Sequence, residues 1–180
     1  METKLFGDKK LTISPLSKKD FKFAKEFLDF INSLIEEDAK ILINKKINLK
    51  EEAEFLEKGV KSIQNKKKVY LIAKDGNKVV ANTSIELGVY KRNHIGRFAI
   101  GIRNGYRGIG LGTYLMQEIM KLAKKELSPN LKIFQLEAFE NNKPAIALYK
   151  KMGFKIVGKI PKQIQYKGKL IAEYIMIKNI

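Results

Sequence analysis

Three glycines at alternate positions in the middle of the chain are the first residues whose spacing suggests chemistry. Gly108, Gly110 and Gly112 follow Arg107 and come directly before apolar residues at helical spacing. Glycine lets a backbone approach a ligand closely and adopt positive φ without strain. A helix that begins at such a turn offers free N–H groups and the positive end of its dipole, which together bind anions such as phosphate. The stretch therefore predicts an anion-binding turn, to which Arg107 adds a positive charge.

The spacing of these glycines does not fit the two best-known phosphate-binding motifs. A P-loop requires a lysine just before a serine or threonine after its last glycine, whereas Gly112 is followed directly by Thr113. The dinucleotide-binding fingerprint requires a third glycine three positions after the second, and counting from Gly110 that position is again Thr113. A strand–helix turn that is merely glycine-rich is the alternative that these residues alone leave open.

The elements that position this turn follow from the periodicity of the apolar residues. A buried strand is expected at Phe98–Ile102, before the turn, and a helix ending near Glu126 is expected after it. Further helices are expected to begin after Ser17, Asn48 and Asn142, which are favourable N-cap residues. Further strands are expected at residues 11–13, 69–73, 79–87, 133–139, 154–157 and 172–177.

Length and composition indicate a single domain over residues 1–180, with 44% hydrophobic residues. The chain has no cysteine and one histidine, so neither a thiolate nor a histidine-rich metal site is expected. No apolar run approaches the ~20 residues of a membrane span, and the first residues lack the apolar core of a signal peptide. A cytoplasmic protein with no membrane partner is therefore expected.

The net charge of +17 raises nucleic acid as a partner. Arginine is the residue that best reads phosphates and base edges, but only four of the 36 basic residues are arginine. The lysines are spread along the chain apart from the run Lys66–Lys68. This distribution favours a solvated, lysine-rich surface over a specific nucleic-acid-binding one.

Two sequence motifs together resemble the signatures of the GNAT superfamily of N-acetyltransferases. Arg107–Gly112 resembles the Q/R-x-x-G-x-G/A signature, and a second match to N-x-x-A-x-x-L-Y-x-x-x-G-F follows about thirty residues later. Both lie within residues 96–158, on successive strand–helix units. The second motif consists of Asn142, Ala145, Leu148, Tyr149, Gly153 and Phe154.

The resemblance implies an α/β (α+β) fold. The implied sheet is mixed, mostly antiparallel, with about six to seven strands flanked by about four helices. It splays open at its centre, between the Phe98–Arg103 strand and the Ile133–Phe139 strand. Acetyl-coenzyme A (acetyl-CoA) is the implied cosubstrate and is expected in this wedge, without a metal. A homodimer is compatible with the resemblance.

The resemblance also implies roles for individual residues. Strand backbone pairs with the pantetheine arm, the amides of the glycine turn hold the pyrophosphate, and Tyr149 lies beside the sulfur as a proton donor. A tyrosine on an apolar helix stripe usually packs in the core, but the surrounding motif favours the catalytic role. The expected cofactor-binding residues are Ile100, Gly101, Ile102, Arg107, Gly108, Ile109, Gly110, Leu111, Gly112, Thr113, Asn142 and Tyr149.

The implied reaction is direct attack of a primary amine on acetyl-CoA. Only a neutral amine attacks, so a group must remove a proton from an acceptor whose pKa is ~8 to ~10.4. Glu137, beside the wedge, is the candidate base, but its strand face is not fixed by the sequence. Glu86, His94 and a water relayed by either glutamate stay open, and a lone histidine is more often structural.

The acceptor implied by the resemblance is an amino acid, a small amine or a protein N-terminus. Three successive acids, Glu36, Glu37 and Asp38, are expected to be a solvated helix end rather than a binding site for a cationic acceptor. The loop at residues 39–47 follows them. A basic module that binds nucleic acid or ribosomes on the same fold, without turnover, is the alternative function.

Overall fold

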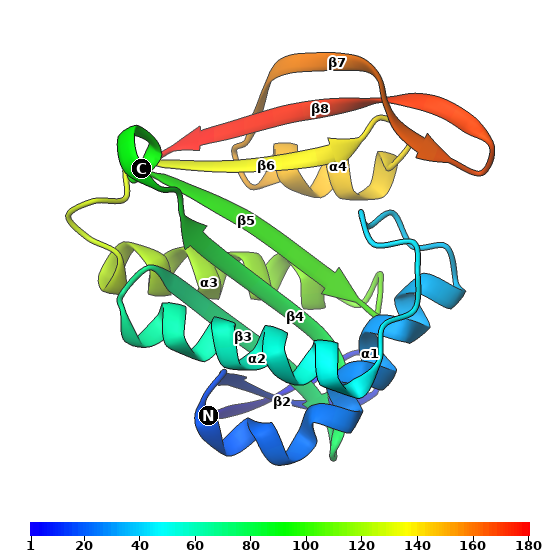
Figure 1. The fold of residues 1–180 in the computed structure, drawn as a ribbon, viewed down its shortest axis with the longest axis vertical. Helices are drawn as coiled ribbons and strands as arrows, with labels where there is room; N and C mark the ends of the chain where they lie inside the picture. Colours follow the sequence, from blue (N-terminus) through cyan, green and yellow to red (C-terminus); the bar gives the residue numbers. More distant parts are fainter.

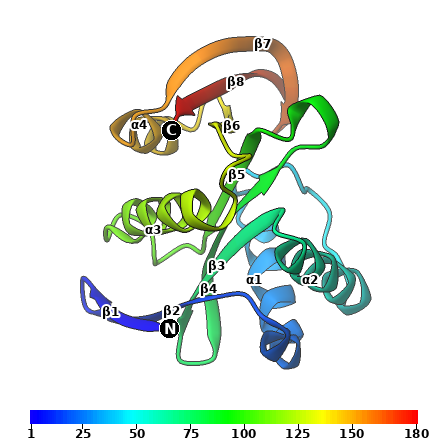
Figure 2. The same cartoon turned by 90° about the vertical axis from the view of Figure 1, so that its left-hand side faces the viewer.

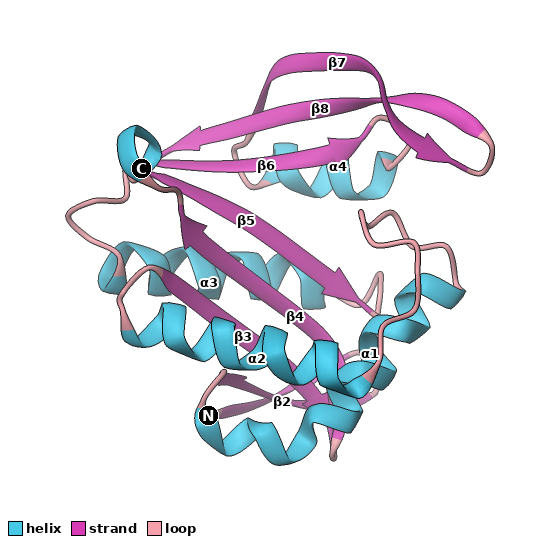
Figure 3. Ribbon diagram, in the orientation of Figure 1, coloured by secondary structure: helices cyan, strands magenta, loops and turns pink.

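The computed structural model describes residues 1–180, which form one central sheet with helices on both faces (Figure 1, Figure 3). The strands are β1 (Glu2–Phe6), β2 (Lys9–Pro15), β3 (Lys68–Asp75), β4 (Lys78–Leu87), β5 (Ile95–Ile102), β6 (Ile133–Phe139), β7 (Lys155–Tyr166) and β8 (Lys169–Asn179). The helices are α1 (Ala24–Glu36), α2 (Leu49–Gln64), α3 (Leu111–Glu126) and α4 (Lys143–Lys151), with short 3₁₀ helices η1 (Lys18–Phe23) and η2 (Tyr90–Arg92). None of these helices combines the length and apolar character needed to cross a membrane.

The sheet has eight strands in the order β1-β2-β3-β4-β5-β6-β8-β7. Helices α3 and α4 cover one face, and α1 and α2 cover the other (Figure 2). Strand alternation supplies both cores, because neighbouring residues point to opposite faces. Leu71 packs with α3 and α4 residues in one cluster, whereas Tyr70 and Ile72 pack with α1 and α2 in another.

The sheet opens into a wedge between β5 and β6, the two strands that run parallel (Figure 1). Their pairing is limited to residues 95–97 of β5 and 133–135 of β6, and every other pairing is antiparallel. Past this short ladder the remainder of β5 has a strand neighbour only on its β4 side. The mixed, splayed α/β sheet is therefore confirmed, with eight strands rather than six or seven.

Helix beginnings follow the expected capping residues with one change. Asn48 starts α2: its Oδ1 accepts from the Glu51 N–H at 3.0 Å, and its own N–H donates to Glu51 Oε2 at 2.7 Å. Ser17 donates from both its N–H and its Oγ to Asp20 Oδ2, each at 3.0 Å. However, the turn that follows Ser17 is the 3₁₀ helix η1, and α1 begins only at Ala24.

Candidate active site

Along the free edge of β5, the backbone N–H and C=O groups of alternate residues face the wedge. Arg103 N–H donates to Val80 O on the β4 side, whereas the carbonyl of His94 accepts from β6-side amides of Lys132 and Ile133. Because backbone groups alternate along a strand, odd-numbered residues of β5 bond to β4 and even-numbered ones face the wedge. Ile100 and Ile102 consequently present their backbone groups to the wedge.

Gly101, in contrast, lies in the β4–β5 ladder opposite Asn82. A Cβ at this position would lie 3.1 Å from Leu34 and 3.3 Å from Phe30, so glycine here lets α1 approach the sheet. The structure thus brings Ile100 and Ile102 to the wedge edge but places Gly101 against α1. The expected buried strand is fully buried only at Phe98, since the wedge leaves residues 99–102 at least partly exposed.

The glycine turn offers a row of unused backbone donors. The first bond of α3 runs from Tyr114 N–H to Gly110 O at 3.1 Å. None of the six preceding amides donates a hydrogen bond within the protein; these belong to Gly108, Ile109, Gly110, Leu111, Gly112 and Thr113. Free N–H groups at the start of a sixteen-residue helix form an anion site.

The three glycines of the turn serve different purposes. Gly108 and Gly110 have φ of 77° and 88°, in the left-handed region that favours glycine, and a Cβ on either would meet nothing within 4 Å. Gly112 is confined, because a Cβ there would lie 3.2 Å from both Ile102 and Leu148 side chains. Gly108 and Gly110 therefore shape an open cradle, whereas Gly112 lets α3 pack between β5 and α4.

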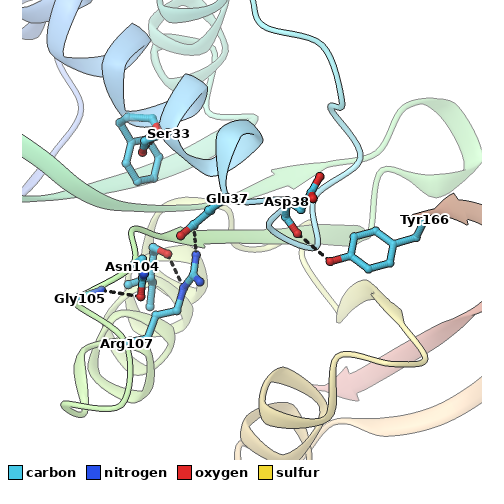
Figure 4. A network of polar contacts seen from close by, with 9 residues as sticks. Ser33, Glu37, Asp38, Asn104, Gly105, Arg107 and Tyr166 are labelled. Atoms are coloured by element: carbon cyan, nitrogen blue, oxygen red, sulfur yellow. Dashed lines mark hydrogen bonds and ion pairs between the residues drawn. The ribbon is translucent and has the colours of Figure 1, made fainter. Parts of the chain in front are cut away.

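Arg107 is engaged rather than free at this turn (Figure 4). Its Nε donates to the carbonyl of Ile102 at 2.7 Å, and its Nη2 pairs with the Glu37 carboxylate. One wedge-facing backbone acceptor is thus covered by this side chain. The Arg107 charge is also partly compensated, so the free amides are the stronger feature of the anion site.

The three acids after α1 connect separate parts of the protein. Asp38 lies near the β7–β8 hairpin, where its carbonyl accepts from the Tyr166 hydroxyl at 2.8 Å and its carboxylate is 3.3 Å from Lys167 Nζ (Figure 4). The Glu36 and Asp38 side chains are 58% and 63% exposed, as expected of a solvated helix end. Glu37 differs from that expectation, because it is 21% exposed and bound to Arg107.

Tyr149 lies at the apex of the wedge, on the face covered by α3 and α4. The residue is 8% exposed, and its ring makes an edge contact with Phe98 at 6.2 Å between centroids. Its hydroxyl has no hydrogen-bond partner in the protein, although a buried tyrosine usually finds one. Burial raises the pKa of Tyr149 to about 12, so the hydroxyl keeps its proton.

Asn142 occupies the N-cap position of α4, but its side chain makes no capping hydrogen bond. The expected side-chain cap is therefore absent, and the first helical bond runs from Ile146 N–H to Asn142 O at 3.0 Å. Gly153 ends the helix region at φ 87°, as expected of a glycine after a helix. The free Asn142 amide stays available to a ligand.

The proposed bases fall into two groups. Glu137 is exposed on β6, on the face opposite the buried Leu136, and so on the side of α1 and α2; its carboxylate accepts from Gln135 Nε2 at 2.9 Å. Glu86 is tied to Lys68 Nζ at 3.1 Å, and its register partner on β5 lies within the short β5–β6 ladder. His94 lies before the first residue of β5. Glu86 and His94 thus lie at the closed end of the wedge, whereas Glu137 lies at the start of its opening.

Two buried carboxyl groups were not predicted from the sequence. Glu52 on α2 is 5% exposed and Glu173 on β8 is 7% exposed, and neither has a hydrogen bond or ion pair. Burial raises the pKa of both, and the charge of Glu137 adds to the effect on Glu173. Glu52 could have been found from helical spacing, since it precedes the buried Leu56 by four positions.

A pocket of about 260 Å³ lies between the α1–α2 connection and the β6 and β7 strands. Eight of the twelve residues that line it are hydrophobic, and the rings of Phe139 and Tyr166 meet edge to face at 5.8 Å. The lining residues are Ile35, Asp38, Ala39, Ile41, Leu42, Ile43, Asn44, Phe139, Gln163, Ile164, Gln165 and Tyr166.

Residues 32–154, which include the wedge, the glycine turn and α4, match the model of the acetyltransferase (GNAT) family. The chain therefore belongs to this family. An L-amino acid N-acetyltransferase of Escherichia coli (strain K12), AaaT, is 30% identical over 88 residues, which are 49% of this chain and 53% of the relative. An N-alpha-acetyltransferase of Sulfurisphaera tokodaii is 45% identical over 67 residues, 37% of this chain and 38% of that relative.

These alignments span about half or less of the length of the two relatives. Similarity over the whole fold comes from solved structures. A GNAT-family acetyltransferase from Streptococcus pneumoniae has a TM-score of 0.81 and 30% identity, with coverage of 94% of this chain and 99% of that one. The protein yncA from Salmonella typhimurium, solved with its cofactor acetyl-CoA, has a TM-score of 0.79 at 15% identity and covers 94% and 93%, which shows a shared fold.

Proposed function

We propose that this protein is an acetyl-CoA-dependent N-acetyltransferase that acts on a primary amine. The observation that carries the proposal is the row of six free amides at the mouth of a wedge whose β5 edge is unpaired. A diphosphate needs several donors in one place, and a linear amide-containing arm needs a free strand edge. Family membership and the fit between these two features support the same ligand.

The residues of this chain have separate roles in holding that ligand. The amides of residues 108–113 bind its diphosphate, and the wedge-facing backbone of Ile100 pairs with its amide-bearing arm. The free side chain of Asn142 is a further polar partner at the start of α4. The Ile102 N–H is also free to pair with this arm, whereas the Ile102 carbonyl can join only if Arg107 releases it. When bound, acetyl-CoA supplies an activated acetyl thioester with a thiol leaving group.

Proton handling falls to residues on opposite faces of the wedge. Glu137 faces the α1–α2 side, where its carboxylate attracts an ammonium group and can accept a proton from it. Tyr149 faces the α3–α4 side, where its protonated and unpartnered hydroxyl can donate to a leaving sulfur. Opposed donors and acceptors of this kind allow direct transfer without a covalent intermediate on the protein.

The pocket beside the α1–α2 connection is the proposed acceptor site. Its apolar lining supports an acceptor whose amine adjoins an apolar side chain, such as an amino acid or a protein N-terminus. The names of the two partial relatives, an amino-acid N-acetyltransferase and an N-alpha-acetyltransferase, support the same two kinds of acceptor. The net charge of +17 disfavours a polyamine.

The test measures cofactor binding and acceptor choice together. Acetyl-CoA should raise the melting temperature, because a ligand that binds only the folded state stabilises it. Thiol release should then occur with amino acids or N-terminal peptides that carry apolar first side chains, and less with spermidine. A preference for spermidine would reverse the acceptor assignment.

If no amine released thiol from acetyl-CoA, the proposal that this protein is an N-acetyltransferase would be contradicted. If acetyl-CoA gave no stabilisation while duplex nucleic acid bound with an affinity that fell steeply with salt, the basic binding module would be the better description.

A further inference from the structure

We infer that the acceptor is the N-terminus of a peptide or protein, with an apolar first residue and acidic residues after it, rather than a free amino acid. This inference rests on the proposed acetyltransferase function. It narrows the acceptor from the chemistry of the pocket between the α1–α2 connection and the strands β6 and β7. The charge of the lining, the exposed lip of the pocket and the lysines around its mouth all favour a peptide.

The lining of the pocket contains no basic residue. Its one charged member is an acid, Asp38, whose carboxylate is already paired with Lys167 Nζ at 3.3 Å. A second acid, Glu137, shares a strand face with the lining residue Phe139, because it precedes Phe139 by two positions on β6. The reacting amine must lie between the pocket and the wedge, and a free amino acid carries its carboxylate on the same carbon. That carboxylate would lie near two acids, whereas the carbonyl of a peptide bond carries no net charge.

Neutral amide side chains supply most of the polar lining. They belong to Asn44, Gln163 and Gln165, which are exposed and make no side-chain hydrogen bond within the protein. Gln163 lies where the register between β7 and β8 shifts, between Ile160 and Ile164. A side-chain amide has both donors and an acceptor, so it can pair with the N–H or the C=O of a peptide bond. The polar lining therefore suits a peptide chain and offers no positive charge to a carboxylate.

The outer wall of the pocket is open to an acceptor that continues beyond it. Leu42 and Ile43 line the pocket but are 72% and 46% exposed, whereas Phe139 is 5% exposed. The volume of about 260 Å³ lies just below the ~300–1,000 Å³ of sites that enclose a small molecule. Exposed apolar surface beside a pocket is typical of sites that bind another chain. One apolar side chain consequently fits inside, and the residues that follow it can cover Leu42 and Ile43.

The α1–α2 connection is anchored at both ends, so this lip has a defined position. Near its start, the carbonyl of Asp38 accepts from the Tyr166 hydroxyl at 2.8 Å (Figure 4). At its end, the side chain of Asn32 on α1 donates to the Ile47 carbonyl and accepts from the Ile47 N–H, both at 3.1 Å. A site that is ordered before binding loses less conformational entropy when the ligand arrives.

The mouth of the pocket is basic, although its lining is not. The Nζ atoms of Lys40 and Lys167 each lie 5.7 Å from the centre of the Tyr166 ring, which lines the pocket. Lys167 is paired with Asp38, whereas Lys40 is in no ion pair. A peptide that leaves the pocket thus passes from acids near the wedge to lysines at the mouth, so acids after its first residue are attracted. Four lysines directly adjoin lining residues in the sequence: Lys40, Lys45, Lys162 and Lys167.

The experiment compares four acceptors by thiol release from acetyl-CoA. They are leucine, leucinamide and two peptide amides that begin with leucine and serine and continue with four glutamates or with four lysines. The kcat/KM of each is expressed per neutral amine, from the measured pKa of its amine, so that amine acidity does not set the order. Leucinamide should exceed leucine by about tenfold, because it lacks the carboxylate. The glutamate peptide should exceed leucinamide by about tenfold again and the lysine peptide by about 10²-fold, and added salt should narrow the gap between the peptides.

Lys40→Glu tests the basic mouth directly. It should reduce the preference for the glutamate peptide over the lysine peptide by about tenfold, because the charge nearest the Tyr166 ring changes sign. Turnover of leucinamide, which does not reach the mouth, should stay as in the wild type. Lys78→Glu is a matched control, since Lys78 is an exposed lysine in no ion pair at the β3–β4 turn. It should leave the peptide preference unchanged.

Three results would overturn the inference while leaving the acetyltransferase in place. They are a kcat/KM for free leucine that equals that of the glutamate peptide, equal values for the two peptides, and equal losses of preference in Lys40→Glu and Lys78→Glu. The last result would mean that the net charge of the protein, and not the mouth of the pocket, selects the acceptor. Turnover of leucinamide in the same assay shows that the enzyme is active. Absence of turnover with all four acceptors would instead remove the proposed function, and this inference with it.

Discussion

Burial limits the ability of Tyr149 to transfer its proton, because it raises the pKa of the hydroxyl. A thiol with a pKa of ~8.5 is a stronger acid than a tyrosine with a pKa of about 12. The difference of ~3.5 pKa units makes complete transfer to a thiolate uphill by about 5 kcal/mol. A hydrogen bond from the unpartnered hydroxyl is a better description than full protonation. Tyr149 would stabilise charge on the leaving sulfur as it develops, and solvent would finally protonate it.

Tyr149→Phe tests this role directly. The ring and its edge contact with Phe98 are kept, so folding and acetyl-CoA affinity should change little, while the loss of a hydrogen bond to the developing charge should lower turnover by about 10²- to 10³-fold. Because the hydroxyl stays protonated to about pH 12, the wild type should show no activity loss from this residue between pH 7 and 10. Steady-state kinetics and cofactor titration check both points. A variant that lost cofactor affinity and stability together would mark Tyr149 as a packing residue only.

Residues inside a motif were easier to place from sequence than residues outside one. The paired motifs pointed to Tyr149 and the glycine turn, because each combines a residue type with a fixed local structure. The Glu37–Arg107 pair joins residues seventy positions apart, so no local pattern announces it. The helical spacing of Glu52 places it on the buried face of α2, but a glutamate at such a position is ordinarily expected to be exposed.

The glycine turn between β5 and α3 is the element on which cofactor binding depends. Its two left-handed glycines point no side chain into the space in front of the free amides. The β1–β2 hairpin braces the same turn, since a Cβ on Gly7 would lie 3.6 Å from Ile109 and the rings of Phe6 and Tyr114 meet at 5.3 Å. The turn is therefore held from outside as well as by its own backbone.

Gly110→Glu should abolish the thermal stabilisation by acetyl-CoA. The new side chain enters the open cradle, and its charge repels phosphate. Gly76→Glu is a matched control, because Gly76 also has positive φ, 58°, and nothing within 4 Å of its Cβ position, but lies in the β3–β4 turn. Both variants carry similar backbone strain of about 1 kcal/mol. Equal cofactor-induced shifts in the two variants, measured by thermal melting, would show that the turn does not bind the ligand.

At the level of elements, the sequence predicted those with a strong apolar pattern. Strands β3, β4 and β6 and helices α2 and α3 match their expected positions to within a few residues. Strand β1 was missed because four of its five residues are exposed, and β7 was predicted too short because most of it is exposed. These edge strands form through backbone pairing, which leaves little trace in the side-chain pattern.

The molecule as a whole consists of two wings joined by a short ladder. One wing contains β1 to β5, and the other contains β6, β8 and β7. The order of elements and the position of the wedge were predictable from the resemblance, but the contacts across it were not. The ties from the end of α1 to Arg107, on the glycine turn, and to Tyr166, on the far wing, depend on where distant segments meet.

The unpaired edge of β5 also determines how fast its amide hydrogens exchange with deuterated solvent. The amides of Ala99 and Gly101 bond to β4, so they should exchange slowly with and without the ligand. The amides of Ile100 and Ile102 have no strand acceptor and should exchange faster in the free protein. Acetyl-CoA should slow exchange at the second pair alone, which would give an alternating footprint along a single strand. Residue-resolved exchange with and without the ligand measures it, and slowing spread evenly over the strand would indicate general tightening instead of edge pairing.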